Sequence, residues 1–141
     1  MRNLSVKFFA VFLVGFLCLT GCTKTNDPEK TAASFLEAYY THANLDKSKS
    51  LTSGLAQQKI DDQIALGGGQ KGAGEESKRQ VGFSKKENIE GMEKDQTATR
   101  KSMLYQIDIT RAGSTDEIHL LVRLTLEQEG GQWKVVNFAE S

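Results

Sequence analysis

The side chains best placed for acid–base chemistry are Asp108 and His119, on either side of the turn sequence AGST. If AGST closes a regular hairpin, pairing Ile109 with Ile118 sets Asp108 directly opposite His119. A carboxylate beside an imidazole is an arrangement that serves a general base. Both residues, however, belong to the polar positions that alternate with the apolar ones along each strand. The interpretation that we favour is therefore an exposed cross-strand pair, and a catalytic pair is the alternative.

Other polar groups give weaker indications of chemistry. His42 ends the first predicted helix, where a cationic side chain suits the helix dipole, so a role as catalytic base is the less favoured interpretation. Asp61 and Asp62 are neighbours and point to different sides of a helix, which is a poor geometry for paired carboxylates or for a metal. With two histidines in the chain and no free cysteine expected in the mature domain, we predict no metal site and no cofactor.

The N-terminus has the layout of an exported protein. Residues 1–7 carry two positive charges and no acid, residues 8–19 are uninterruptedly apolar, and Thr20 and Gly21 are small. The apolar run is too short to span a bilayer, which takes about 20 residues. We therefore predict a signal peptide over residues 1–21 that does not belong to the fold.

The sequence Leu19-Thr20-Gly21-Cys22, directly after this run, resembles a bacterial lipobox. The resemblance implies that a diacylglyceryl group alkylates the Cys22 thiol, that the chain is cut before Cys22, and that the acyl chains hold the protein on a membrane. Thr23, and not Asp, follows Cys22, so if the cell has two membranes the resemblance to sorted lipoproteins implies the outer one. Because Cys18 lies in the leader, Cys22 is the one cysteine of the mature chain, so we expect neither a disulfide nor a catalytic thiol.

Behind the lipobox we predict a short tether over residues 22–27 and a single domain over residues 28–141. The mature chain carries 16 basic and 18 acidic residues, because two of the 18 basic residues in the whole sequence precede Cys22. This balance argues against a nucleic-acid partner, which calls for a basic face. Residues 67–78 are rich in glycine and poor in apolar residues, and they predict a flexible surface loop.

The first half of the domain shows helical periodicity. Asp27 is a typical N-cap, Pro28 suits the first helical position, and apolar residues then recur at spacings of three and four. This pattern predicts a long helix that begins at Pro28 and ends near Asn44. A weaker apolar stripe follows, and the pair Ser53-Gly54 divides it into two short helices.

The second half changes to a period of two, which is typical of strands. Alternating apolar residues predict four antiparallel strands, over residues 79–86, 101–111, 116–128 and 133–139. The last strand has apolar side chains on both of its faces, so we expect it either to be bulged or to be covered on both sides.

This order of elements, with the opening sequence ASFLEAYY and the closing sequence GGQWKVVNF, resembles the nuclear transport factor two-like (cystatin-like) superfamily. Within it, the resemblance is to small bacterial lipoproteins of unassigned role. It implies an α+β fold in which a long helix and short helices pack on a curved, roughly four-stranded antiparallel sheet, shaped like a cone. A plain two-layer arrangement of helices on a sheet is the alternative.

Three functions stay open. The favoured one is a non-enzymatic accessory lipoprotein that binds a partner protein or a small apolar ligand at the cell envelope. The second, implied by the resemblance, is a small isomerase or dehydratase with an acid/base residue in the cone. The third is a structural module that forms a homodimer through its open sheet, where Leu104 and Leu121 interrupt the polar face. For a ligand pocket in the cone, the candidate lining residues are Tyr39, Tyr40, Tyr105 and Trp133.

Overall fold

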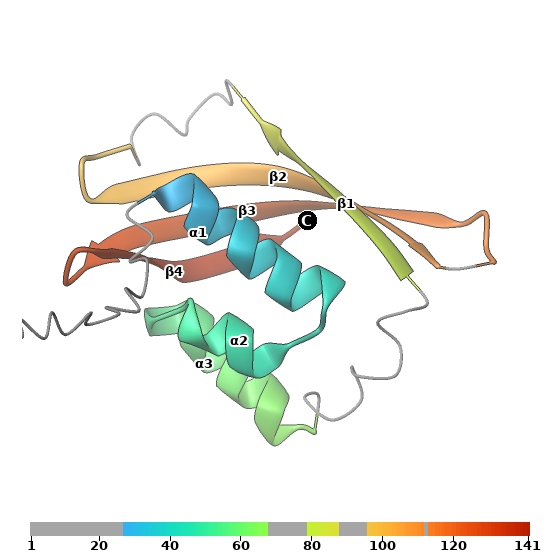
Figure 1. The fold of residues 1–141 in the computed structure, drawn as a ribbon, viewed down its shortest axis with the longest axis horizontal. Helices are drawn as coiled ribbons and strands as arrows, with labels where there is room; N and C mark the ends of the chain where they lie inside the picture. The colour runs from blue at the N-terminus through green and yellow to red at the C-terminus, as the bar shows by residue number, and fades with distance from the viewer. Residues whose placement is uncertain (1–26, 68–78, 88–95, 112) are drawn as a thin grey trace, which may run out of the picture.

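A computed structural model describes residues 27–67, 79–87, 96–111 and 113–141. Helices pack on one face of a four-stranded antiparallel sheet, which gives the described chain an α+β fold (Figure 1). This architecture confirms the fold class that the sequence predicts. The predicted signal peptide, Cys22 and residues 68–78 of the glycine-rich loop lie outside the described residues.

The first helix begins where the capping residues indicate. Helix α1 spans Pro28–Leu36, and the Asp27 side chain accepts a hydrogen bond from the backbone N–H of Glu29 at 2.9 Å. It continues into a π-helix, η1, over Glu37–Thr41, in which the His42 N–H donates to the Glu37 carbonyl five residues back. The helix therefore ends three residues earlier than the predicted end near Asn44. The physical reason lies in residue 43, whose φ of 47° leaves the helical region.

Two short helices follow, as predicted. Helix α2 spans Leu45–Ser50 and helix α3 spans Gly54–Ala65. The residues between them run beside the last strand, because Thr52 forms a parallel bridge with Val135 and the Ser53 N–H donates to the Val135 carbonyl at 3.0 Å. Since those backbone groups pair with the strand, they cannot also continue a helix.

The sheet is a four-stranded antiparallel meander in the order β1-β2-β3-β4. Its strands are β1 (Arg79–Lys86), β2 (Arg100–Arg111), β3 (Glu117–Glu129) and β4 (Gln132–Glu140).

The pairing of β2 and β3 has the predicted register. Ile109 lies opposite Ile118, and Asp108 lies opposite His119. The register of β4 shifts next to Val136, because Thr125 pairs with Asn137 whereas Leu126 pairs with Val135. The last strand is therefore bulged, which was one of the two predicted alternatives.

Apolar side chains fill the space between the helices and the inner face of the sheet. The core includes Tyr105 and Trp133, which are 5% and 7% exposed. Burial of each large side chain contributes roughly 1.5–3 kcal/mol, so the interior of this cone is what holds the layers together. Fully buried members are Ala32, Phe35, Leu36, Ala56, Ile60, Ile107, Val122, Leu124, Leu126 and Val135.

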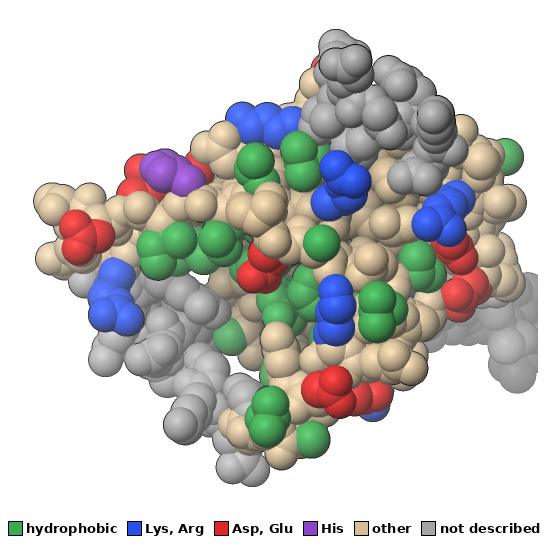
Figure 2. Space-filling view, turned by 180° about the vertical axis from the view of Figure 1, so that it is seen from behind, with side chains coloured by type: hydrophobic (Ala, Val, Ile, Leu, Met, Phe, Trp, Pro, Cys, Tyr) green, Lys and Arg blue, Asp and Glu red, His purple; other side chains and the backbone are tan. Residues whose placement is uncertain are grey.

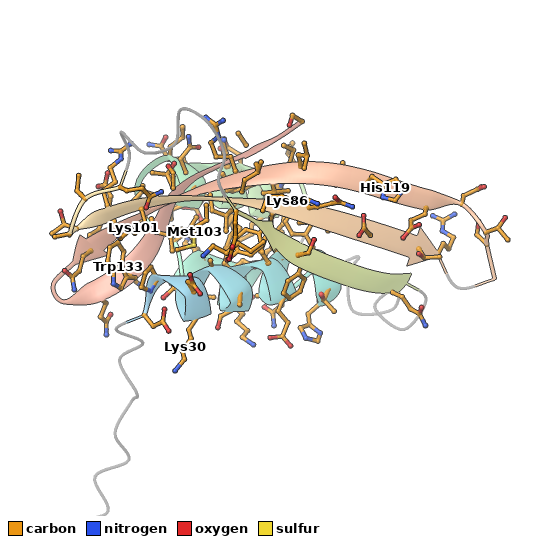
Figure 3. The ribbon with its side chains drawn as sticks, turned by 90° about the horizontal axis from the view of Figure 1, so that it is seen from above. Lys30, Lys86, Lys101, Met103, His119 and Trp133 are labelled. Carbon is orange, nitrogen blue, oxygen red and sulfur yellow. The ribbon has the colours of Figure 1, made fainter. Side chains whose placement is uncertain are left out.

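The β2–β3 hairpin extends past the end of the first helix (Figures 1 and 3). At this end the helices do not cover the sheet, and Ile118 and Phe83 are 57% and 39% exposed although they occupy apolar positions of their strands. On the outer face Leu121 is 40% exposed and Leu104 is half-buried. Apolar surface is therefore accessible at the hairpin end.

Candidate functional site

The outer face of the β2–β3 hairpin brings Asp108 and His119 together. His119 Nδ1 lies 2.7 Å from Asp108 Oδ1, which also accepts a hydrogen bond from Gln106 Nε2 at 2.9 Å. The His119 side chain is 60% exposed, and Figure 2 shows a histidine beside acidic side chains on the molecule seen from behind. The pair is thus an exposed cross-strand contact on the surface that faces away from the helices.

A third group completes this cluster. Glu117 Oε2 lies 3.9 Å from His119 Nε2, and ligand atoms of Asp108, Glu117 and His119 all lie within 4.8 Å of one another. Such a set offers carboxylate and imidazole ligands to a cation. An exposed ion pair accounts for the same contacts without a metal, since Asp108 already occupies Nδ1 of the ring.

The two partners shift each other's titration. The hydrogen bond that His119 donates to Asp108 raises the pKa of His119 above its ordinary value of 6.5. Hydrogen bonds from Gln106 and then from His119 lower the pKa of Asp108 below 3.8. The contribution of His119 to stability is therefore complete below pH 6.5 and is lost as pH rises through its folded pKa. The contribution of Asp108 is present above pH 3.8 and is lost as pH falls through its own folded pKa.

An NMR titration of the His119 ring tests this coupling. We expect a pKa above 6.5 in the unmodified chain, and Asp108→Asn lowers it because the neutral amide no longer stabilises the imidazolium. Asp116→Asn, in the same hairpin, serves as the control and leaves the titration unchanged. An equal shift in both variants would show that the Asp108 contact does not set the pKa.

A second group of polar side chains converges where the first helix, α3 and the end of β4 meet. They border an open pocket with a volume of about 350 Å³, which we call the α3–β4 pocket. This volume lies at the small end of the range for ligand sites. The lining residues are Tyr39, Lys59, Asp62, Gln63, Phe138, Ala139 and Glu140.

Two consecutive tyrosines reach this region because the helix widens there. Successive residues of an α-helix point about 100° apart, whereas the π-helical turn lets the Tyr39 and Tyr40 rings meet edge to face at 4.9 Å. The Tyr40 hydroxyl donates to Glu140 Oε1 at 2.5 Å, and Gln63 Nε2 donates to the Tyr39 hydroxyl at 2.5 Å. Short π-helical turns often mark functional positions, and here the turn joins the helix to β4.

Burial keeps both hydroxyls protonated. Desolvation raises the pKa of Tyr39 and of Tyr40, and the Glu140 carboxylate raises the pKa of Tyr40 further through the hydrogen bond. A tyrosine with a raised pKa is a hydrogen-bond donor at neutral pH and a poor base. The two tyrosine hydroxyls therefore do not act as bases at neutral pH.

Comparison with known protein families identifies the family to which this domain is similar. The family model described as the YddI NTF2-like domain matches residues 24–139. The chain belongs to the YddI NTF2-like family. The match takes in every described helix and nearly all of the sheet, so the resemblance to the nuclear transport factor two-like superfamily is confirmed.

Solved structures share the fold of this YddI-family domain at low identity. A protein from Thiobacillus denitrificans, described as a calcium/calmodulin-dependent protein kinase type II association domain, is 14% identical with a TM-score of 0.59, and the match covers 81% of this chain and 93% of that one. A ketosteroid isomerase-like protein from Erwinia carotovora atroseptica is 11% identical with a TM-score of 0.55, covering 85% of this chain and 96% of that one. Among curated proteins, none matches significantly. At these identities the likeness concerns the fold alone.

Three other site residues that the sequence suggested, Tyr105, Trp133 and His42, do not line the α3–β4 pocket of the YddI-family domain. Tyr105 and Trp133 are core residues, and burial raises the pKa of Tyr105 to about 12. His42, at the end of η1, lies 3.4 Å from Glu37 and has a 37% exposed side chain. Of the four aromatic residues predicted to line a cone pocket, Tyr39 lines the α3–β4 pocket and Tyr40 reaches it through Glu140.

Sequence reasoning missed most of the pocket. Lys59 and Gln63 stand four positions apart, a spacing that puts them on one face of α3 and could have flagged them. Nothing local pairs them with Phe138 and Glu140, which come from the far end of the chain. Lys59 Nζ donates to the Phe138 carbonyl at 2.5 Å, which fixes α3 against β4.

In the part of the chain that the structure covers, no helix combines the length and the apolar character that crossing a membrane demands.

Proposed function

We propose that this YddI NTF2-like protein is a membrane-anchored lipoprotein of the bacterial envelope, and that its domain is a non-enzymatic binding module. The observation that carries the binding role is the filled cone. Phe35, Ile107 and Leu124 are fully buried between helix and sheet, so the place where a cone enzyme would hold its substrate is occupied by side chains. Polar groups instead converge in an open pocket at the surface.

The acid–base pair on the sheet supports the same choice. Asp108 and His119 share a short contact, but they lie on an exposed face where water screens their charges. General acid–base catalysis gains most in a site that excludes water. A structural cross-strand pair is therefore the better account of these two residues than an isomerase or dehydratase dyad.

The lipobox sequence supports the anchor. Two acyl chains on Cys22 would hold the protein on a bilayer, since each buried methylene contributes about 0.8 kcal/mol. The tether from Cys22 to Asp27 would keep the domain within roughly 20 Å of the lipid surface, because an extended residue spans at most ~3.6 Å. The ligand would accordingly be one that is met at the membrane.

Substitution of the two cysteines tests the anchor. We expect Cys22→Ala to move the protein from the detergent phase to the aqueous phase in Triton X-114 partition, and to abolish labelling by radioactive palmitate. Cys18→Ala is the matched control and leaves both readouts unchanged, since Cys18 belongs to the leader. A Cys22→Ala protein that still carries the palmitate label would refute the lipid attachment.

A further inference from the structure

We infer that the α3–β4 pocket binds a primary aliphatic amine, supplied either by a small molecule or by a lysine side chain of a partner protein. The inference rests on the binding role proposed above, but it does not depend on the lipid anchor. Its basis is the charge, the walls and the size of the pocket.

The charges of the lining favour a cation. The pocket holds one lysine, Lys59, and two carboxylates, Asp62 and Glu140. Lys59 Nζ directs its hydrogen bonds to β4, to the Phe138 carbonyl at 2.5 Å and to Asn137 Oδ1 at 3.1 Å. Across the described residues neither Asp62 nor Glu140 forms an ion pair with a cationic side chain. The lining therefore carries an excess of one negative charge.

Two lining side chains, Glu140 and Asp62, offer hydrogen-bond acceptors to a ligand. Glu140 uses Oε1 to accept from Tyr40, which leaves its second oxygen as an acceptor. Asp62 adds two exposed carboxylate oxygens on the same side of α3 as Lys59. An ammonium group has three donors and no acceptor, so it matches this lining, whereas an anion would meet two carboxylates.

Aromatic rings form the remaining wall. Tyr39 and Phe138 meet edge to face with centroids 5.1 Å apart, and both rings line the pocket. The face of an aromatic ring attracts a cation within about 6 Å. Lys59 Nζ lies over the Phe138 ring at 5.0 Å from its centroid and already occupies it, so the ring available to a ligand cation is that of Tyr39. The methylene stem of an aliphatic amine would pack on the rings while its ammonium group reaches the carboxylates.

The size limits the ligand to a short chain. A volume of about 350 Å³ accommodates an alkyl chain of the length found in lysine, and the open shape admits it from the surface. An uncharged apolar ligand, which the sequence left open, would strip water from Asp62 and Glu140 without replacing their hydrogen bonds. A short aliphatic amine fits the volume of the pocket and also supplies hydrogen bonds to the two carboxylates.

Titration of the full chain in detergent micelles tests the inference by NMR. The probes are n-pentylamine for a free amine, N-acetyl-lysine methylamide for a lysine side chain, and pentanoate for the reversed charge. We expect saturable millimolar binding of an amine, with shifts at the backbone amides of Gln63 and Ala139, and none with pentanoate. Tighter binding of the lysine derivative would identify a partner protein as the source, and tighter binding of pentylamine a small molecule.

Neighbouring carboxylates provide a matched control. Asp62→Asn is expected to weaken amine binding by about tenfold or more. Asp61→Asn leaves it unchanged, because Asp61 pairs with Lys49 on another side of the same helix. Glu140→Gln is the second test variant, since its amide oxygen can still accept from Tyr40. Thermal melts verify that the variants fold.

Three results would overturn the inference. They are the absence of shifts with both amines, an equal loss of binding in Asp61→Asn and Asp62→Asn, and equal binding of pentanoate. None of these bears on the partition and palmitate readouts of Cys22→Ala, so failure of the amine site and failure of the lipid anchor are separable.

Discussion

Phe35→Ala is expected to lower the free energy of unfolding by about 3–5 kcal/mol, the range for truncation of a buried aromatic ring. Phe35 is fully buried, and its ring centroid lies 5.3 Å from that of Phe138 and 5.5 Å from that of Tyr39. Its removal opens a cavity between α1 and β4 that these neighbours cannot fill without leaving their own contacts. For a domain of this size the melting temperature should fall by roughly 15 °C.

Phe83→Ala is the matched control for this substitution. The Phe83 side chain is 39% exposed on β1, so its truncation should cost less than about 1 kcal/mol. Urea unfolding followed by tryptophan fluorescence measures both variants, because Trp133 is the single tryptophan of the chain and is 7% exposed. Similar losses for the two phenylalanines would mean that the packing around Phe35 does not dominate the core.

Substitution of two glycines by alanine is expected to change the free energy of unfolding in opposite directions. Gly54→Ala should destabilise the fold by about 1–2 kcal/mol, since a residue with a side chain resists the left-handed region and the φ of Gly54 is +55°. A Cβ there would meet the Val136 carbonyl oxygen at 3.6 Å, an ordinary contact, so the cost is one of backbone conformation rather than of space.

Gly82→Ala should leave stability unchanged or raise it by up to about 1 kcal/mol. Gly82 lies in β1 without a positive φ, and a Cβ built there meets no atom within 4 Å. Thermal unfolding of the two variants under the same conditions measures the difference. A stabilising Gly54→Ala would show that the turn before α3 can be made in another backbone conformation.

Elements with strong local signals could be predicted from the sequence. The β2–β3 register follows from a short turn between two alternating strands, since a shift of one residue would turn Ile109 and Ile118 to the other face. The start of α1 follows from Asp27 and Pro28, whose capping chemistry depends on their nearest neighbours. In both cases the residues that determine the structure lie within about a dozen positions of one another in the sequence.

Elements that depend on distant contacts could not be predicted. The sequence of the π-helical turn, EAYYT, differs in no local respect from an α-helical stretch, and the turn joins the helix to β4 through Tyr40 and Glu140, which are 100 positions apart. The α3–β4 pocket could not be predicted for the same reason, because its residues come from distant parts of the chain. Its aromatic candidates were visible as residue types, but their distribution between core and surface depends on how α3 packs against the bulged strand.

The two edges of the sheet differ in a way that limits assembly. The outer edge of β4 is already engaged by the bridge from Thr52 to Val135, whereas β1 has no neighbouring strand on its outer side among the described residues. Strand addition by a second copy is therefore expected at β1 rather than at the middle of β4, because the bridge from Thr52 occupies β4 at Val135.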